Sequence, residues 1–160
     1  MPNLRKLLVG LFVCSSMLAQ ETPPPSHMLT SSDLNAQGAE LLQQARASQF
    51  GFAAKVLLDR PDSNIQVTVR LKSGQGEWHR DDADILIGVE GTAQIITGGQ
   101  IVHGRETAPG EMRGDGVQGG TTQPFGPGDT LRIEPRVAHQ MLLAPGTTVR
   151  YMAVKVHAAR

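Results

Sequence analysis

The feature that most constrains this chain is a series of short segments, from about residue 52 onward, in which apolar and polar residues alternate. The clearest example is 65–71, in which Ile65, Val67 and Val69 are separated by polar residues. A period of two is typical of β-strands with two chemically different faces. Turn residues separate the segments, and the 160 residues include 18 glycines and 10 prolines. The pattern predicts an all-β domain.

The expected strands are all short, and turns rich in Gly, Pro, Asp or Asn separate most of them. They span residues 52–58, 65–71, 77–79, 85–89, 93–96, 100–103, 131–133, 140–143 and 148–156. No internal repeat is visible along them, which favours a single domain over residues 51–160.

One helix is expected ahead of the strands. Residues 33–50 are rich in Ala, Leu, Gln and Glu, which favour helix. Ser31, Ser32 and Asp33 are candidate N-caps, and Gly51 follows the last helical residue. Apolar residues recur at helical spacing, namely Leu34, Leu41, Leu42 and Ala45. We expect this stripe to pack on the strands.

The N-terminus has the pattern of an export signal. Arg5 and Lys6 precede an apolar run at 7–13, which is too short to span a bilayer. Small residues follow, and cleavage is expected after Ala19. Residues 1–19 are therefore predicted to be a signal peptide, and the protein to be secreted or periplasmic.

The mature chain would contain no cysteine, because Cys14 is the only one in the sequence. Disulfides and thiol chemistry would then be excluded. Lipidation of Cys14 is disfavoured because the residue before it is a valine rather than a small residue. We therefore expect no stable membrane anchor. Residues 20–32, with three consecutive prolines, should form a flexible lead-in.

A histidine and two carboxylates recur at a distinctive spacing in the first half of the domain. Glu77 and His79 are two residues apart, and six residues separate Asp84 from Gly91. This resembles the first sequence motif of the cupin superfamily, with Glu77 and His79 at its two histidine positions and Asp84 at its glutamate. A rival register, with His79 and Asp81 as the histidines, leaves too few residues before Asp84.

The segment after Gly128 resembles the second cupin motif. His139 takes its histidine position. Glu134 stands where proline is usual, with Pro135 displaced by one, and Arg136 replaces a glycine. The resemblance implies an all-β fold, a cupin-like jelly-roll β-barrel, and the N-terminal α-helix lies outside it. It also implies a homodimer, by analogy only.

The resemblance further implies a metal site formed by Glu77, His79, Asp84 and His139. Glu77 and His79 would lie on one face of a strand. Imidazole and carboxylate ligands together favour a divalent metal ion, namely Mn, Fe or Zn. Asp84 is one methylene shorter than the glutamate of the motif and therefore reaches less far toward a metal. In the alternative, the site is vestigial, and the two histidines hydrogen-bond to the carboxylates without metal.

A small-molecule pocket is expected beside the histidines. Met141 and Leu143 should share a strand face with His139, so the lumen near that histidine should be apolar. His103 could reach the mouth of the barrel and contact a ligand. The alternative for His103 is an exposed position at a strand end.

Residues 105–120 are rich in glycine and poor in apolar residues. We expect them to form a long excursion at the barrel mouth, with a short strand near 111–113. Glu111, Arg113 and Asp115 could recognise a ligand from this excursion. The glycines around them could equally serve tight turns.

Composition narrows the function further. Basic and acidic residues balance at 15 each, and aromatic residues make up 4%, so neither charge nor stacking favours a nucleic-acid partner.

The favoured hypothesis is a secreted, metal-dependent enzyme with dioxygenase-like or lyase-like chemistry, because an open metal position can polarise a carbonyl or enol, or bind O₂. The alternatives are a non-catalytic barrel that binds a small molecule and an interaction domain with a vestigial site.

Overall fold

The computed structural model of the protein describes residues 26–157. Over this range a helix is followed by strands that form two main antiparallel sheets and one two-stranded sheet. The predicted signal peptide and part of the predicted lead-in lie outside the described residues. No helix within the described range is long and apolar enough to cross a membrane.

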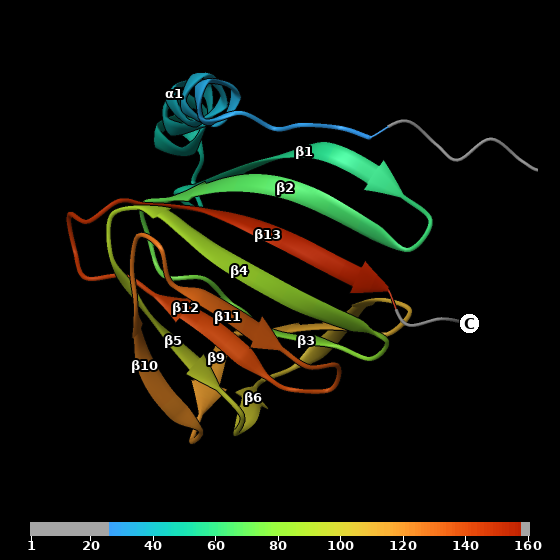
Figure 1. The fold of residues 1–160 in the computed structure, drawn as a ribbon. Coiled ribbons are helices and arrows are strands. Elements are labelled where there is room, and N and C mark those ends of the chain that lie inside the picture. Colours follow the sequence, from blue (N-terminus) through green and yellow to red (C-terminus); the bar gives the residue numbers. More distant parts are fainter. Residues whose placement is uncertain (1–25, 158–160) are drawn as a thin grey trace, which may run out of the picture.

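Helix α1 spans Ser31–Ala47 and lies against the first two strands (Figure 1). Its N-cap is Thr30, one residue before the predicted candidates. The Thr30 side chain accepts a hydrogen bond from the Asp33 backbone at 3.1 Å, and the Asp33 carboxylate accepts one from the Thr30 backbone at 2.9 Å. This reciprocal capping box fixes the start of the helix. The expected apolar stripe is confirmed, because Leu41 and Ala45 are buried against the sheet.

The first sheet has five strands. In spatial order they are β1 (Phe52–Arg60), β2 (Ser63–Arg70), β13 (Val149–His157), β4 (Asp82–Glu90) and β11 (Thr130–Ile133). The last long strand, β13, inserts between β2 and β4 and pairs with both. Figure 1 shows β1, β2, β13 and β4 running side by side.

The second sheet has six strands. In spatial order they are β10 (Thr121–Phe125), β5 (Ala93–Thr97), β12 (His139–Leu142), β3 (Gly76–His79), β8 (Glu111–Gly114) and β7 (Arg105–Ala108). Strands β6 (Gln100–Val102) and β9 (Gly116–Gln118) form a separate pair. Among the described residues the two main sheets are not joined into one closed barrel. Each predicted strand is present, with ends displaced by at most three residues.

Strand β2 shows how the alternating pattern is used. Val67 and Val69 are buried under α1, in a cluster with Leu41. The polar residues between and beside them face the other way, and Gln66 and Arg70 line a cavity between the sheets. The apolar face of this strand therefore packs on the helix, and its polar face belongs to the interior between the two sheets.

A second apolar cluster fills the space between the sheets. It comprises the buried residues Leu86, Ile95, Phe125, Ile133, Met141, Val149, Tyr151 and Ala153. Their strands belong to both main sheets. The cluster holds the two sheets together and forms the apolar wall of the cavity.

The structure corrects the expectation of a single long excursion at 105–120. These residues contain the strands β7, β8 and β9, and β8 confirms the short strand expected near 111–113. The glycines serve close packing as well as turns, since a Cβ on Gly114 would lie 2.3 Å from both Ile101 Cγ2 and the Val102 carbonyl oxygen. Low hydrophobicity here reflects an exposed outer strand, because all four residues of β7 are exposed.

Candidate metal centre

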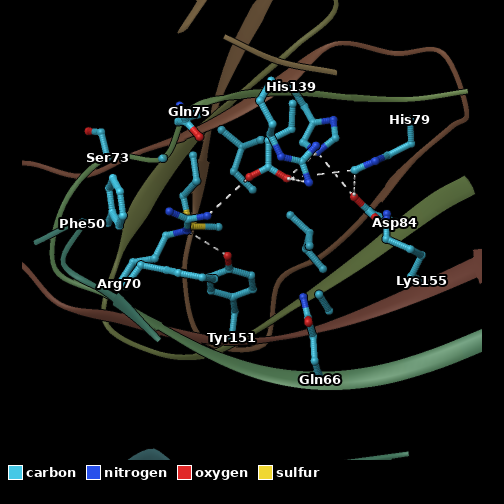
Figure 2. Close-up of a pocket in the computed structure, with 18 residues that line it drawn as sticks. Phe50, Gln66, Arg70, Ser73, Gln75, His79, Asp84, His139, Tyr151 and Lys155 are labelled. Carbon is cyan, nitrogen blue, oxygen red and sulfur yellow. Dashed lines mark hydrogen bonds and ion pairs between the residues drawn. The ribbon is translucent and has the colours of Figure 1, made fainter. Parts of the chain in front are cut away.

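Strand pairing brings the two motifs together. Glu77 and His79 lie on β3, and β12 pairs with β3 so that His139 stands opposite Glu77. Asp84 comes from β4, in the other sheet. The centre is therefore assembled from both sheets, at the end of the cavity that Figure 2 shows around His79, Asp84 and His139.

The donor atoms of the four residues converge. His79 Nε2 lies 3.0 Å from Asp84 Oδ2, and His139 Nε2 lies 3.4 Å from the same oxygen. Glu77 Oε2 lies 4.0 Å from each of the two Nε2 atoms. Donors that share one ion at about 2.0–2.2 Å can be no more than about 4.4 Å apart, and these four of the six donor pairs meet this limit. Glu77, His79 and His139 form a group whose donor atoms lie within 4.8 Å of one another. Asp84 stands outside that group and adjoins it through the two histidines rather than through Glu77.

Both imidazole rings are held through Nδ1. His79 Nδ1 lies 2.7 and 2.8 Å from the two carboxylate oxygens of Glu111, on the neighbouring strand β8. His139 Nδ1 donates to the Val137 carbonyl at 3.1 Å. A proton on each Nδ1 leaves the lone pair on each Nε2, which is the tautomer that a metal ligand needs.

The surroundings of His79 Nε2 test whether a metal ion fits these four residues. This atom is buried, and with its proton on Nδ1 it faces the Asp84 carboxylate, another acceptor, at 3.0 Å without a hydrogen bond. A buried polar atom without a partner is costly. A divalent ion among the four donors would satisfy it, so the residues present fit such an ion.

Asp84 is the most strongly perturbed acid of the centre. Burial alone would raise the pKa of its carboxyl group. Its interactions with His139 and His79, together with the charge of Lys155, outweigh burial and hold that pKa far below its usual range. Lys155 Nζ lies 3.2 Å from Asp84 Oδ1. Asp84 is therefore ionised at neutral pH, as a metal ligand must be.

The backbone keeps a glycine-type conformation at two glycine positions of the motifs. Gly91 has a φ of +74°, and a Cβ there would lie 1.9 Å from the Thr148 carbonyl oxygen. Arg136, which replaces a motif glycine, also adopts a positive φ, +66°, and its N–H donates to the His79 carbonyl at 2.7 Å. The backbone conformation that favours glycine persists although the glycine does not. In the rival register Asp81 would be a ligand, but it is exposed and pairs with Arg80 at 2.9 Å.

A cavity of about 470 Å³ opens beside the centre. Met141 lines it, as the sequence predicted. Leu143 does not line the cavity, because β12 ends at Leu142 and the next residue packs against the outside of the lining, on the apolar cluster that contains Met141. His103 does not line the cavity either and takes the alternative position, exposed at a strand end. It lies in a turn after β6, its side chain is 80% exposed, and its Nδ1 pairs with Asp115 at 2.8 Å.

Sequence reasoning missed several polar residues of the cavity. Arg70 from β2 and Tyr151 and Lys155 from β13 all line it, and none belongs to either motif. Arg70 Nε donates to the Tyr151 hydroxyl at 3.0 Å. Burial raises the pKa of Tyr151 although the Arg70 charge opposes it, so the phenol keeps its proton. The one available signal was Arg70, a cation on the polar face of the clearest alternating strand.

Comparisons with known proteins support the fold. No protein-family model and no curated protein matches the chain. Among solved structures, one similar chain is an uncharacterized conserved protein with a double-stranded β-helix domain from Klebsiella pneumoniae. It is 15% identical with a TM-score of 0.52, and the match covers 69% of this chain and 81% of that one.

Two further solved structures are similar. A variant of the Streptomyces protein PAC13, solved with uridine, is 10% identical with a TM-score of 0.50, covering 71% of this chain and 75% of that one. A cupin-like protein from Thermotoga maritima is 16% identical with a TM-score of 0.47, covering 66% and 68%. The chain has the cupin-type jelly-roll fold that the two motifs implied.

Proposed function

We propose that this is an exported protein that binds a divalent metal ion through Glu77, His79, Asp84 and His139, and that it uses the ion to bind and transform a small molecule in the adjacent cavity. Manganese, iron and zinc suit this mixture of imidazole and carboxylate donors. Dioxygenase-like or lyase-like chemistry is the proposed class. A non-catalytic small-molecule-binding protein is the second candidate, since the cavity can hold a ligand whether or not the protein transforms it.

The observation that carries the proposal is the convergence of two oriented Nε2 atoms with two carboxylates. The side chain of His79 is 4% exposed and that of His139 is 8% exposed. Two buried imidazoles whose Nε2 atoms face two acids are difficult to explain by stability alone, because one of these nitrogens has no hydrogen-bond partner among residues 26–157. A cation among them supplies the missing partner.

The residues of the centre have separable roles. A bound divalent ion would supply Lewis acidity toward a carbonyl or enol oxygen of the ligand. Glu111 orients His79, and Lys155 neutralises the outer oxygen of Asp84. Glu77 has a side chain that is 24% exposed and lines the cavity, so its carboxylate, if released from the ion, is the candidate base for a ligand proton.

Elemental analysis of protein purified without chelators or metal-affinity resin tests the proposal. We expect about one equivalent of a transition metal in the wild type, and at least a tenfold loss of affinity in His139→Ala, because one of four ligands is removed. His103→Ala is the matched control, since it removes an exposed histidine and should retain the metal. Equal metal content in both variants, or none in the wild type after metal is added, contradicts the proposal.

A further inference from the structure

Arg70 is a nearly buried cation that faces the same cavity. Its side chain is 11% exposed. Its Nε donates to the Tyr151 hydroxyl at 3.0 Å, and its guanidinium carbon lies 4.4 Å from the centroid of the Phe52 ring. Figure 2 shows Arg70 and Tyr151 on one side of the cavity, with His79 and Asp84 on the other. The guanidinium group is therefore fixed in position, and it contacts the metal centre only through Glu77.

The charge of Arg70 is only partly compensated. Its one anionic neighbour among residues 26–157 is Glu77, with 3.4 Å between Arg70 Nη2 and Glu77 Oε1. The other oxygen of this carboxylate faces the two histidines and also lies 3.5 Å from Arg113. An ion bound at Oε2 would draw on the same negative charge. A buried cation needs a counter-charge, so Arg70 would then lack one.

The summed charge of the groups around the cavity also indicates that the metal-loaded site needs an anion. The cations that line it are Arg70, Arg113 and Lys155, and the carboxylates are Glu77 and Asp84. Two carboxylates lie behind the lining, Glu111 at 3.4 Å from Arg113 and Asp82 at 3.8 Å from Lys155. With neutral histidines the three cations and four carboxylates sum to −1, so a divalent ion would leave the site with a charge of about +1.

We propose that the cavity binds a small organic anion whose carboxylate is held by Arg70. This rests on the proposed function, since it names the ligand class of the same cavity. The body of the ligand would lie against the apolar wall formed by Leu86, Ile95 and Met141, within about 470 Å³. A monocarboxylate fits better than a phosphate, because Arg113 and Lys155 each have a carboxylate partner outside the metal ligands, Glu111 and Asp82. Within the described range, Arg70 has Glu77 alone and is the one cation of the lining that needs an anion.

Calorimetric titration with benzoate and with benzamide tests the inference, because the two probes have nearly the same shape and differ in charge. For metal-loaded wild-type protein we expect benzoate to bind at least tenfold more tightly than benzamide, since the carboxylate gains a charge-assisted hydrogen bond. Arg70→Gln should abolish this preference. Arg132→Gln, which changes an exposed arginine paired with Glu134, should retain it.

Because Arg70 also contacts Tyr151 and Phe52, the melting temperature and circular dichroism of each variant are measured in parallel. Arg70→Lys, which keeps the charge, should retain part of the preference even if Arg70→Gln fails to fold. Equal affinity for both probes, no binding of either, or a preference that survives in folded Arg70→Gln overturns the inference. Metal content is measured on the same samples. An Arg70-dependent preference without bound metal would overturn the proposed function and leave the anion site in place.

Discussion

At the scale of single residues, the two histidines of the centre are oriented in different ways. Backbone geometry holds His139, through the Val137 carbonyl two residues earlier. A carboxylate from another strand holds His79, because Glu111 on β8 accepts from its Nδ1. A carboxylate behind an imidazole fixes its tautomer and makes its Nε2 a stronger donor to a metal. Glu111 therefore acts on the centre without being a ligand.

Replacing Glu111 by alanine should weaken metal binding by about ten- to a hundredfold, the usual effect of removing such a supporting carboxylate. Asp115→Ala is a matched control, because it removes the same kind of contact from the exposed His103. Competition titration with a chromophoric chelator gives both affinities. If Glu111→Ala binds metal as tightly as Asp115→Ala, Glu111 does not support the centre.

At the scale of elements, the segment 105–120 combines an inner strand and an outer one. Strand β8 pairs with β3 on one side and with β7 on the other. Strand β7 lies at the edge of the sheet, and all its residues are exposed. Local patterns could not separate the two strands, because both are polar and flanked by glycines. Their difference comes from a long-range pairing with β3.

Hydrogen exchange should therefore divide this segment. Amides of Glu111–Gly114 should exchange at least tenfold more slowly than those of Arg105–Ala108, because opening an edge strand breaks fewer contacts than opening a strand paired on both sides. Val67 and Val69 in β2 provide the slow reference. Uniformly fast exchange across 105–114 would show that β8 is not stably paired, and the support of His79 by Glu111 would then be transient.

Strand β2 shows what its own pattern could and could not predict. The alternation identified a strand, and its ends were nearly correct. The pattern did not show which face points between the sheets, because both faces are covered. Val67 and Val69 pack under α1. Arg70 faces the interior between the sheets and is nearly buried there. From the sequence alone, a polar residue that faces the interior between two sheets cannot be distinguished from one that faces solvent.

At the scale of the whole molecule, motif spacing carried long-range information that local patterns lacked. Asp84 and His139 lie in different sheets, yet the resemblance of the two motifs to the cupin pattern implied that both lie near His79, as they do. Lys155 and Tyr151 belong to neither motif and reach the cavity only because β13 inserts between β2 and β4. The position of the candidate metal centre was thus predictable, whereas the charged surroundings that select a ligand depend on sheet topology.

The proposed export of the protein is a property of the whole chain. Arg5 and Lys6 followed by the apolar run at 7–13 predict processing by a signal peptidase. Intact mass of periplasmic or secreted material from a bacterial host should show the loss of about nineteen residues, a usual signal-peptide length.

Leu8→Arg places a charge inside the apolar run and should retain the full-length chain in the cytoplasm. His27→Arg adds the same charge after the expected cleavage site and should be exported and cleaved normally. A wild-type chain that stays at full length in the cytoplasm contradicts export, and it would leave Cys14 in the protein.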